Sequence, residues 1–189
     1  MRILVAYASR FGSTAGIAER IGAILRQQGL DAAVVPVETE INPDEFDAAI
    51  VGSAAYFGRW LSTAANFVRR HQQALANRPL WLFSSGPLGL ARQDSKGRDL
   101  CDVAAPHDFR EWSRHLHPRG CRVFFGRLNR ETLPAWQKFI IKLMGHRAEK
   151  LLPEGDFRNW LEIESWAREI ADGLKTQTKR LEPSLLQVV

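Results

Sequence analysis

The sequence predicts an α/β protein in which helices cover both faces of a five-stranded parallel sheet, giving a doubly wound, three-layer α/β/α sandwich. Three observations predict this fold class. Short apolar runs alternate with segments of helical periodicity along most of the chain, and the first apolar run passes through a polar turn into a helix. Other apolar runs end in loops of small or aromatic residues, as strands do at the ligand-binding edge of such sheets. The length of 189 residues fits one domain.

The first strand and the first helix enclose a turn that suits a phosphate group. Residues 3–6 are apolar without interruption, as in a central strand, and the isoleucine and leucine residues of 17–25 repeat at helical spacing. The turn between them supplies hydroxyl groups and a glycine: Ser9, Gly12, Ser13 and Thr14. The first N–H groups of a helix have no intrahelical partners and carry the positive end of its dipole, so we expect an anion here. Capping of the helix by the same hydroxyls is the alternative.

The remaining strands are expected where short apolar runs meet turn residues. They span 31–37, 48–52, 80–83 and 122–125. Between the last two, residues 86–106 show no periodicity, and a long irregular loop of this kind is typically functional or mobile.

Four further helices each have one apolar face. They are predicted at 64–75, 108–116, 134–144 and 159–174. Asp108 with Glu111, and Asn159 with Glu162, have the spacing of capping boxes. We therefore expect one domain over 1–174 and a frayed tail at 175–189.

Three loops at predicted strand ends have unusual compositions: 9–14, 53–60 and 84–89. The first suits a phosphate, and the second and third offer aromatic side chains and glycine-flanked backbone that suit a flat ring. Together they describe a mononucleotide site. The candidate binding residues are Ser9, Arg10, Phe11, Gly12, Ser13, Thr14, Ala54, Ala55, Tyr56, Phe57, Gly58, Trp60, Ser84, Ser85, Gly86, Pro87, Leu88 and Gly89. The aromatic residues among them have an alternative role in the core or at an interface.

The sequence lacks the motifs that are typical of other classes of phosphate-binding protein. The sequence contains no Walker GxxxxGK[ST] motif and no GxGxxG motif. The third strand ends without the aspartate of a receiver domain, and 9–14 contains no nucleophilic cysteine. Cys101 and Cys121 have neither zinc-site nor CxxC spacing, so we expect two unpaired thiols. No metal site and no catalytic acid or base is assigned.

The three loops resemble those of the flavodoxin family. Ser9-x-x-Gly12-x-Thr14 is similar to the loop that binds the FMN phosphate in that family, and 53–60 and 84–89 stand where the family flanks the isoalloxazine ring. The resemblance implies a flavodoxin-like fold with FMN as cofactor.

Further residues resemble the menaquinone-dependent protoporphyrinogen IX dehydrogenases, a family with the same fold. The resemblance covers the chain to about Leu174. It is carried by Gly52-Ser-Ala-Ala-Tyr-Phe-Gly58, the insert after Gly86, Phe139-Ile-Ile-Lys-Leu-Met144 and the segment from Asn159 to Ile170. It implies an FMN-dependent oxidoreductase of haem biosynthesis, associated with the bacterial inner membrane, that oxidises a porphyrinogen with a quinone. The family typically has Arg-Tyr-Gly where this chain has Tyr56-Phe57-Gly58.

The charge of the chain bears on its partners. A net charge of +5 and a pI near 9.6 favour anionic partners, such as a porphyrinogen or another anionic reductant, and disfavour a flavodoxin-type electron carrier, which is typically acidic. No nucleic-acid-binding module is recognised, and no nucleic-acid partner is expected. A flavin-free interaction domain with the same fold is a further alternative. Whether the chain forms a homo-oligomer stays open.

The expected location is cytoplasmic. No run approaches the roughly 18 apolar residues of a spanning helix, and the chain enters a strand without the build of a signal peptide. Residues 136–150 combine basic side chains with an apolar stripe. They suit either peripheral contact with the inner face of the cell membrane or an ordinary helix packed on the core.

Overall fold

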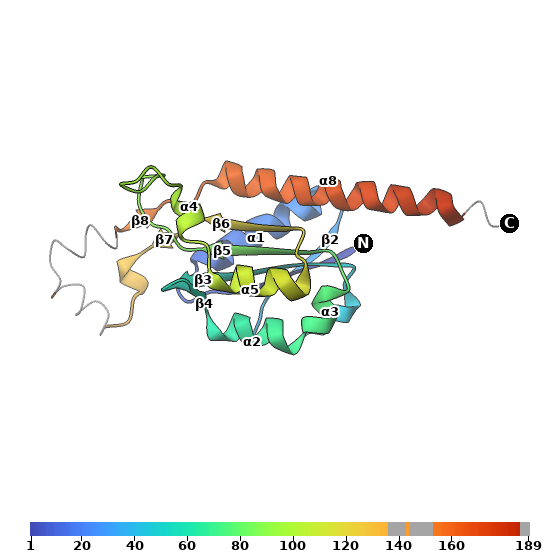
Figure 1. Cartoon of the computed structure of the whole chain (residues 1–189), viewed down its shortest axis with the longest axis horizontal. Coiled ribbons are helices and arrows are strands. Elements are labelled where there is room, and N and C mark those ends of the chain that lie inside the picture. Colours follow the sequence, from blue (N-terminus) through green and yellow to red (C-terminus); the bar gives the residue numbers. More distant parts are fainter. Residues whose placement is uncertain (136–142, 144–152, 186–189) are drawn as a thin grey trace.

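The computed structural model describes residues 1–135, 143 and 153–185. A parallel sheet lies between two layers of helices (Figure 1). The sheet has the strand order β2-β1-β3-β5-β6, with every neighbouring pair in this order parallel. Its strands are β1 (Arg2–Ala8), β2 (Asp31–Pro36), β3 (Ala48–Tyr56), β5 (Leu80–Ser85) and β6 (Gly120–Phe124). The predicted five-stranded, doubly wound sheet is confirmed.

The end of β3 turns back in a hairpin that the sequence did not predict. β4 (Arg59–Trp60) pairs antiparallel with β3 and adds a sixth strand to the sheet. Phe57 and Gly58 form the two-residue turn with φ angles of 52° and 73°. Positive φ at both central residues is what a tight hairpin of this twist requires, and glycine supplies it readily.

Alternate residues of the strands face the two helical layers. On one side, Ile3 and Val5 pack with α1 (Ser13–Gln27) and α8 (Trp160–Leu185). On the other, Leu4 and Ala6 pack with α2 (Ser62–Arg70), α3 (Gln72–Ala76) and α5 (His107–Leu116). The sheet is thus covered on both faces, which explains the continuous apolar runs from which its strands were predicted.

The structure differs from several predicted helix boundaries. The helix expected at 64–75 is divided into α2 and α3 at His71. α8 continues past the expected end at Leu174 to Leu185. Within 86–106, a short helix α4 (Leu100–Val103) forms, and Gln93 pairs with Asp99 in an isolated bridge. The helix expected at 134–144 lies largely outside the described residues.

The two predicted capping boxes have different outcomes. Asn159 caps α8, because its side-chain oxygen accepts the backbone N–H of Glu162 at 3.3 Å. The prediction of a capping box at Asp108 is wrong, because α5 begins at His107, one residue before Asp108, and has no side-chain cap. The Asp108 carboxylate instead accepts the backbone N–H of Trp60 at 2.9 Å.

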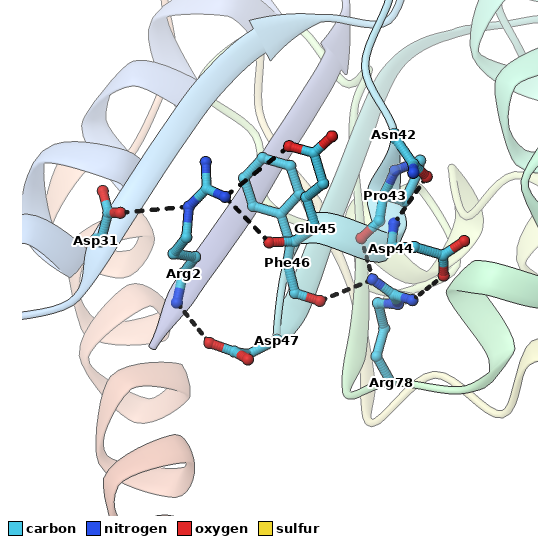
Figure 2. Close-up of polar contacts among 9 residues, drawn as sticks. All are labelled: Arg2, Asp31, Asn42, Pro43, Asp44, Glu45, Phe46, Asp47 and Arg78. Atoms are coloured by element: carbon cyan, nitrogen blue, oxygen red, sulfur yellow. Dashed lines mark hydrogen bonds and ion pairs between the residues drawn. The ribbon is translucent and has the colours of Figure 1, made fainter.

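Two arginines close the end of the sheet where β1 and β3 begin, as Figure 2 shows. The backbone N–H of Arg2 donates to Asp47 at 2.7 Å, and its guanidinium lies over the ring of Phe46. Arg78 donates to the backbone oxygen of Phe46 at 2.7 Å and forms an ion pair with Asp44 in the short helix η1 (Pro43–Glu45). These contacts stabilise this end of the sheet, opposite the carboxyl end from which the three predicted loops leave.

Candidate functional site

The three predicted loops leave the sheet side by side at its carboxyl edge. In the strand register, Ala8 of β1 lies opposite Ser53 of β3, and Ser53 lies opposite Ser84 of β5. β4, α4 and the two-stranded antiparallel sheet of β7 (Arg127–Leu128) and β8 (Gly155–Asp156) lie at this same end, on the left of Figure 1. This edge is where ligands bind in open α/β sheets.

The loop at 9–14 presents the start of α1 without a side-chain cap. Gly12 is the N-cap residue, with a φ of 79°, and the first turn contains no acidic residue. The alternative that the serine and threonine hydroxyls cap this helix is therefore wrong. An uncapped helix start offers free N–H groups and a positive dipole end, which suit an anion.

The hydroxyl groups of this loop have separate roles. Thr14 is fully buried and shares a 2.8 Å hydrogen bond with the hydroxyl of Ser85, so it ties loop 9–14 to loop 84–89. Ser13 accepts the backbone N–H of Arg127 at 2.8 Å. The Ser9 hydroxyl oxygen is buried and has no partner within the described part of the chain. An unpaired buried hydroxyl is costly, so Ser9 fits a site completed by a polar ligand.

Loop 84–89 is fixed by backbone contacts with β6 and the residues after it. The Gly86 N–H donates to Phe124 at 3.2 Å, and the Pro87 carbonyl accepts the N–H of Gly126 at 2.8 Å. The hydroxyl of Ser84 donates to the backbone oxygen of Ser53, so like Thr14 and Ser85 it holds the loops together from inside. Gly86, Pro87, Leu88 and Gly89 are half-buried at the edge.

Loop 53–60 exposes two of its three aromatic side chains. Phe57 is fully exposed at the turn, and Tyr56 is 40% exposed. Partial burial raises the pKa of the Tyr56 phenol, and the positive charge of Arg10 opposes that rise, which links this loop to loop 9–14. Trp60 is 5% exposed and packs edge-on against Trp112. Trp60 is thus a core residue, whereas Tyr56 and Phe57 are available to a ring.

The other predicted residues frame these side chains. The guanidinium of Arg10 lies 5.8 Å from the centre of the Phe11 ring. Ala54 and Ala55 are buried and half-buried at the end of β3. The Gly58 carbonyl accepts the N–H of His107 at 2.9 Å, which anchors the hairpin to α5.

The structure also brings in residues that the sequence analysis did not select. The antiparallel pair of β7 and β8 places Arg127 and Arg158 against loop 9–14. The Arg158 side chain is 6% exposed and forms an ion pair with Asp156 at 2.5 Å. The hydrogen bonds that the Arg158 guanidinium donates to the Asp156 carboxylate lower the pKa of that carboxyl. The position of Arg127 was accessible from sequence, because Gly126 and Arg127 follow the predicted strand at 122–125 and so belong to a fourth strand-end loop.

A cavity lies away from the three loops, and the described residues offer no metal site. They contain no group of three or more His, Cys, Asp and Glu side chains that could hold a metal ion. Cys101 and Cys121 are free, and burial raises the pKa of Cys101 to about 11. A cavity of about 640 Å³ lies between 37–42 and α2, and its lining contains no residue of the three predicted loops. No helix in the described ranges is long and apolar enough to cross a membrane.

Comparison with known proteins identifies the family. Residues 4–151 match the family model described as "Flavodoxin domain". The chain belongs to the flavodoxin domain family. This membership and the fold imply a flavin as the cofactor, with FMN the typical one, and the uncapped α1 start, the unpartnered Ser9 hydroxyl and the exposed Tyr56 fit such a ligand.

Individual relatives support the same assignment. The chain is 25% identical over 176 residues to the protoporphyrinogen IX dehydrogenase [quinone] of Escherichia coli strain K12, covering 90% of this chain and 95% of that protein. An archaeal flavodoxin has a similar structure, with a TM-score of 0.53 and 17% identity over 93% of this chain and 99% of its own. A C101S mutant of a Pseudomonas aeruginosa flavodoxin has a TM-score of 0.56 and 17% identity, with the same coverage. The two solved structures establish the flavodoxin-like fold.

Proposed function

We propose that this protein binds FMN at the carboxyl edge of its sheet, with the phosphate at the start of α1 and the ring beside Tyr56 and loop 84–89. The uncapped helix start, with Gly12 at positive φ, supports the phosphate position. The buried hydroxyl of Ser9, which has no partner in the described residues, supports a polar ligand group at the same place. The partly exposed Tyr56 offers an aromatic face on which a flat ring stacks.

The reaction proposed is oxidation of a porphyrinogen, with a quinone as electron acceptor, in haem biosynthesis. The observation that carries this proposal is the similarity to protoporphyrinogen IX dehydrogenase [quinone] along nearly the full length of both chains. The net charge of +5 supports it, because the porphyrinogen carries carboxylates and is attracted to a basic surface. The same charge argues against a flavodoxin-type carrier that docks on basic reductases.

In this proposal the protein supplies binding and orientation. Bound FMN would supply the redox chemistry by accepting reducing equivalents from the substrate. The backbone of 12–14 would hold the phosphate, and Tyr56 would cover one side of the ring. Phe57, fully exposed at the adjacent turn, would shield the reacting edge from water. No side chain is assigned as a catalytic acid or base.

A cytoplasmic location at the inner face of the cell membrane is part of the proposal. A quinone acceptor is lipid-soluble, and anionic lipid headgroups attract a basic protein. The segment named for this contact, 136–150, lies outside the described residues apart from residue 143. Sedimentation of the full chain with anionic and with neutral vesicles tests the contact: binding to anionic vesicles alone is expected, and equal absence from both pellets would contradict it.

The activity is tested with FMN-loaded protein, protoporphyrinogen IX and a soluble quinone without oxygen, with porphyrin fluorescence as the readout. We expect fluorescence to rise only when FMN and the quinone are both present. Gly12→Asp places a carboxylate at the proposed phosphate position and should abolish FMN uptake. Gly29→Asp is its matched control, because Gly29 has a similar φ of 80° at the other end of α1 with no atom within 4 Å of an added Cβ.

The outcomes separate the candidate functions. Protein that binds FMN but does not oxidise the porphyrinogen would exclude the dehydrogenase and retain a flavoprotein. Protein that takes up no FMN in equilibrium dialysis would support a flavin-free interaction domain. Equal loss of FMN uptake in Gly12→Asp and Gly29→Asp would contradict the phosphate position.

A further inference from the structure

Arg127 is placed beside the proposed phosphate loop by contacts distant in sequence. It begins β7, and its backbone N–H donates to the hydroxyl of Ser13 at 2.8 Å. Its Nη2 atom lies 3.6 Å from the point where a Cβ on Gly12 would stand. The guanidinium therefore borders the turn that opens α1, and the absence of a side chain at Gly12 keeps the space between them open.

Arg127 is exposed and forms no ion pair with an acidic side chain in the described residues, although its charge contributes, after that of Arg158, to the lowered pKa of Asp156. Asp156 lies opposite Arg127 in the β7–β8 register, but its carboxylate is bound by Arg158. An unpaired guanidinium next to an uncapped helix start concentrates positive charge at one point.

Arg158 also contacts loop 9–14, through the backbone carbonyl of Ser13. Its guanidinium binds Asp156 through Nε at 2.8 Å and Nη2 at 2.5 Å, lies 4.2 Å from the Trp160 ring centre, and donates from Nη1 to the Ser13 carbonyl at 3.4 Å. A Cβ on Gly16 would stand 2.5 Å from this guanidinium, so the lack of a side chain at Gly16 admits it. The Arg158 side chain is buried and its charge is paired with Asp156, so its role is to hold the backbone of loop 9–14 in position through Ser13.

From this arrangement we infer that Arg127 is a ligand of the FMN phosphate and that its guanidinium makes the site select FMN over riboflavin. The inference rests on the proposed binding of FMN. A phosphate monoester carries a charge of about −1.5 to −2 near neutral pH, and a guanidinium binds it through charge-assisted hydrogen bonds. Riboflavin has the same ring but no phosphate, so Arg127 should contribute to the binding of one and not of the other.

The test compares dissociation constants for FMN and riboflavin, measured by quenching of flavin fluorescence in wild type, Arg127→Gln and Arg127→Lys. Loss of a hydrogen bond to a charged group should weaken FMN binding by about 10- to 100-fold in Arg127→Gln. Riboflavin binding should change less than about twofold, and Arg127→Lys should recover part of the FMN affinity because it keeps the charge. The salt dependence of FMN binding should also be shallower in Arg127→Gln.

Arg114→Gln is the matched control, since it removes the same charge from an exposed position on α5. It should leave both dissociation constants unchanged. Equal weakening of FMN and riboflavin in Arg127→Gln would assign Arg127 a structural role and overturn the inference, as would unchanged FMN affinity. If wild type binds neither flavin, the proposed FMN function fails as well; if wild type binds FMN tightly and Arg127→Gln equals it, only the role of Arg127 fails.

Discussion

Replacing Asp108 by alanine should destabilise the protein and loosen the hairpin that carries Tyr56. Asp108 is 6% exposed, and its carboxylate accepts the backbone N–H of Trp60 at 2.9 Å, across 48 positions of sequence. This hydrogen bond joins α5 to β4 immediately after the exposed turn. Asp108→Ala would leave the Trp60 N–H buried without an acceptor.

The size of the effect follows from the burial of both groups. A hydrogen bond between a backbone N–H and a charged acceptor contributes about 1.5–3 kcal/mol, and the orphaned donor retains its desolvation cost. In a domain of this size each kcal/mol lowers the melting temperature by about 2–4 °C. We therefore expect Asp108→Ala to melt about 3–12 °C below wild type.

Thermal unfolding followed by circular dichroism measures this change, and Glu111→Ala is the matched control. Glu111 is exposed on the same helix and would be the partner of Asp108 in a capping box. Because the structure has no such box, Glu111→Ala should remain within about 0.5 kcal/mol of wild type. Similar losses in the two variants, or an Asp108→Ala protein as stable as wild type, would refute the assigned role of Asp108.

Further predictions concern packing and pH. Gly52→Ala places a Cβ 2.0 Å from the ring of the fully buried Phe83 and should cost about 1–3 kcal/mol in urea unfolding; a neutral result would contradict the packing. Gly173→Ala in α8 meets no atom within 4 Å and should stabilise by up to about 1 kcal/mol, whereas a loss would show an unseen contact. Hydrogen bonds from Arg158 lower the pKa of Asp156 below 3.8, so the stabilisation is present above that pH and is lost as pH falls through the lower, folded-state pKa. The stability difference between wild type and Asp156→Asn should therefore shrink on going from about pH 6 to about pH 2.5, and a constant difference would oppose this.

The central sheet was predictable because burial on both faces leaves a local signature. Strands such as 3–6 and 80–83 are read from short apolar runs, and their order follows from the general rules for doubly wound folds. The loops at their carboxyl ends were predictable for the same reason, since parallel strands bring those ends together.

Long-range contacts were not predictable from local patterns. Asp108 and Glu111 have capping-box spacing, but the carboxylate of Asp108 is used by Trp60 in a distant hairpin. β7 and β8 contain two residues each, too few for any periodicity. Only the place of Arg127 directly after the predicted strand at 122–125 pointed to this edge of the sheet, and no sequence pattern predicts that Arg158 approaches loop 9–14.

The candidate site was likewise predictable only in part. The composition of the strand-end loops correctly predicted that the three loops are neighbours. It did not show which of their side chains are exposed and which form contacts between the loops. Thr14 and Ser85 bond to each other, and Trp60 packs in the core, whereas Tyr56 and Phe57 are exposed. That division depends on which face of each turn is covered, which only the folded chain determines.

The most direct test of the proposed FMN site is an amide NMR titration of the full chain with FMN. The largest chemical-shift changes are expected for the amides of 9–14, 56–58 and 86–89. With riboflavin in place of FMN, the shift changes of Gly12, Ser13 and Thr14 should be smaller or absent. Saturating FMN that leaves these amides unshifted, or shifts confined to the cavity between 37–42 and α2, would contradict the proposed site.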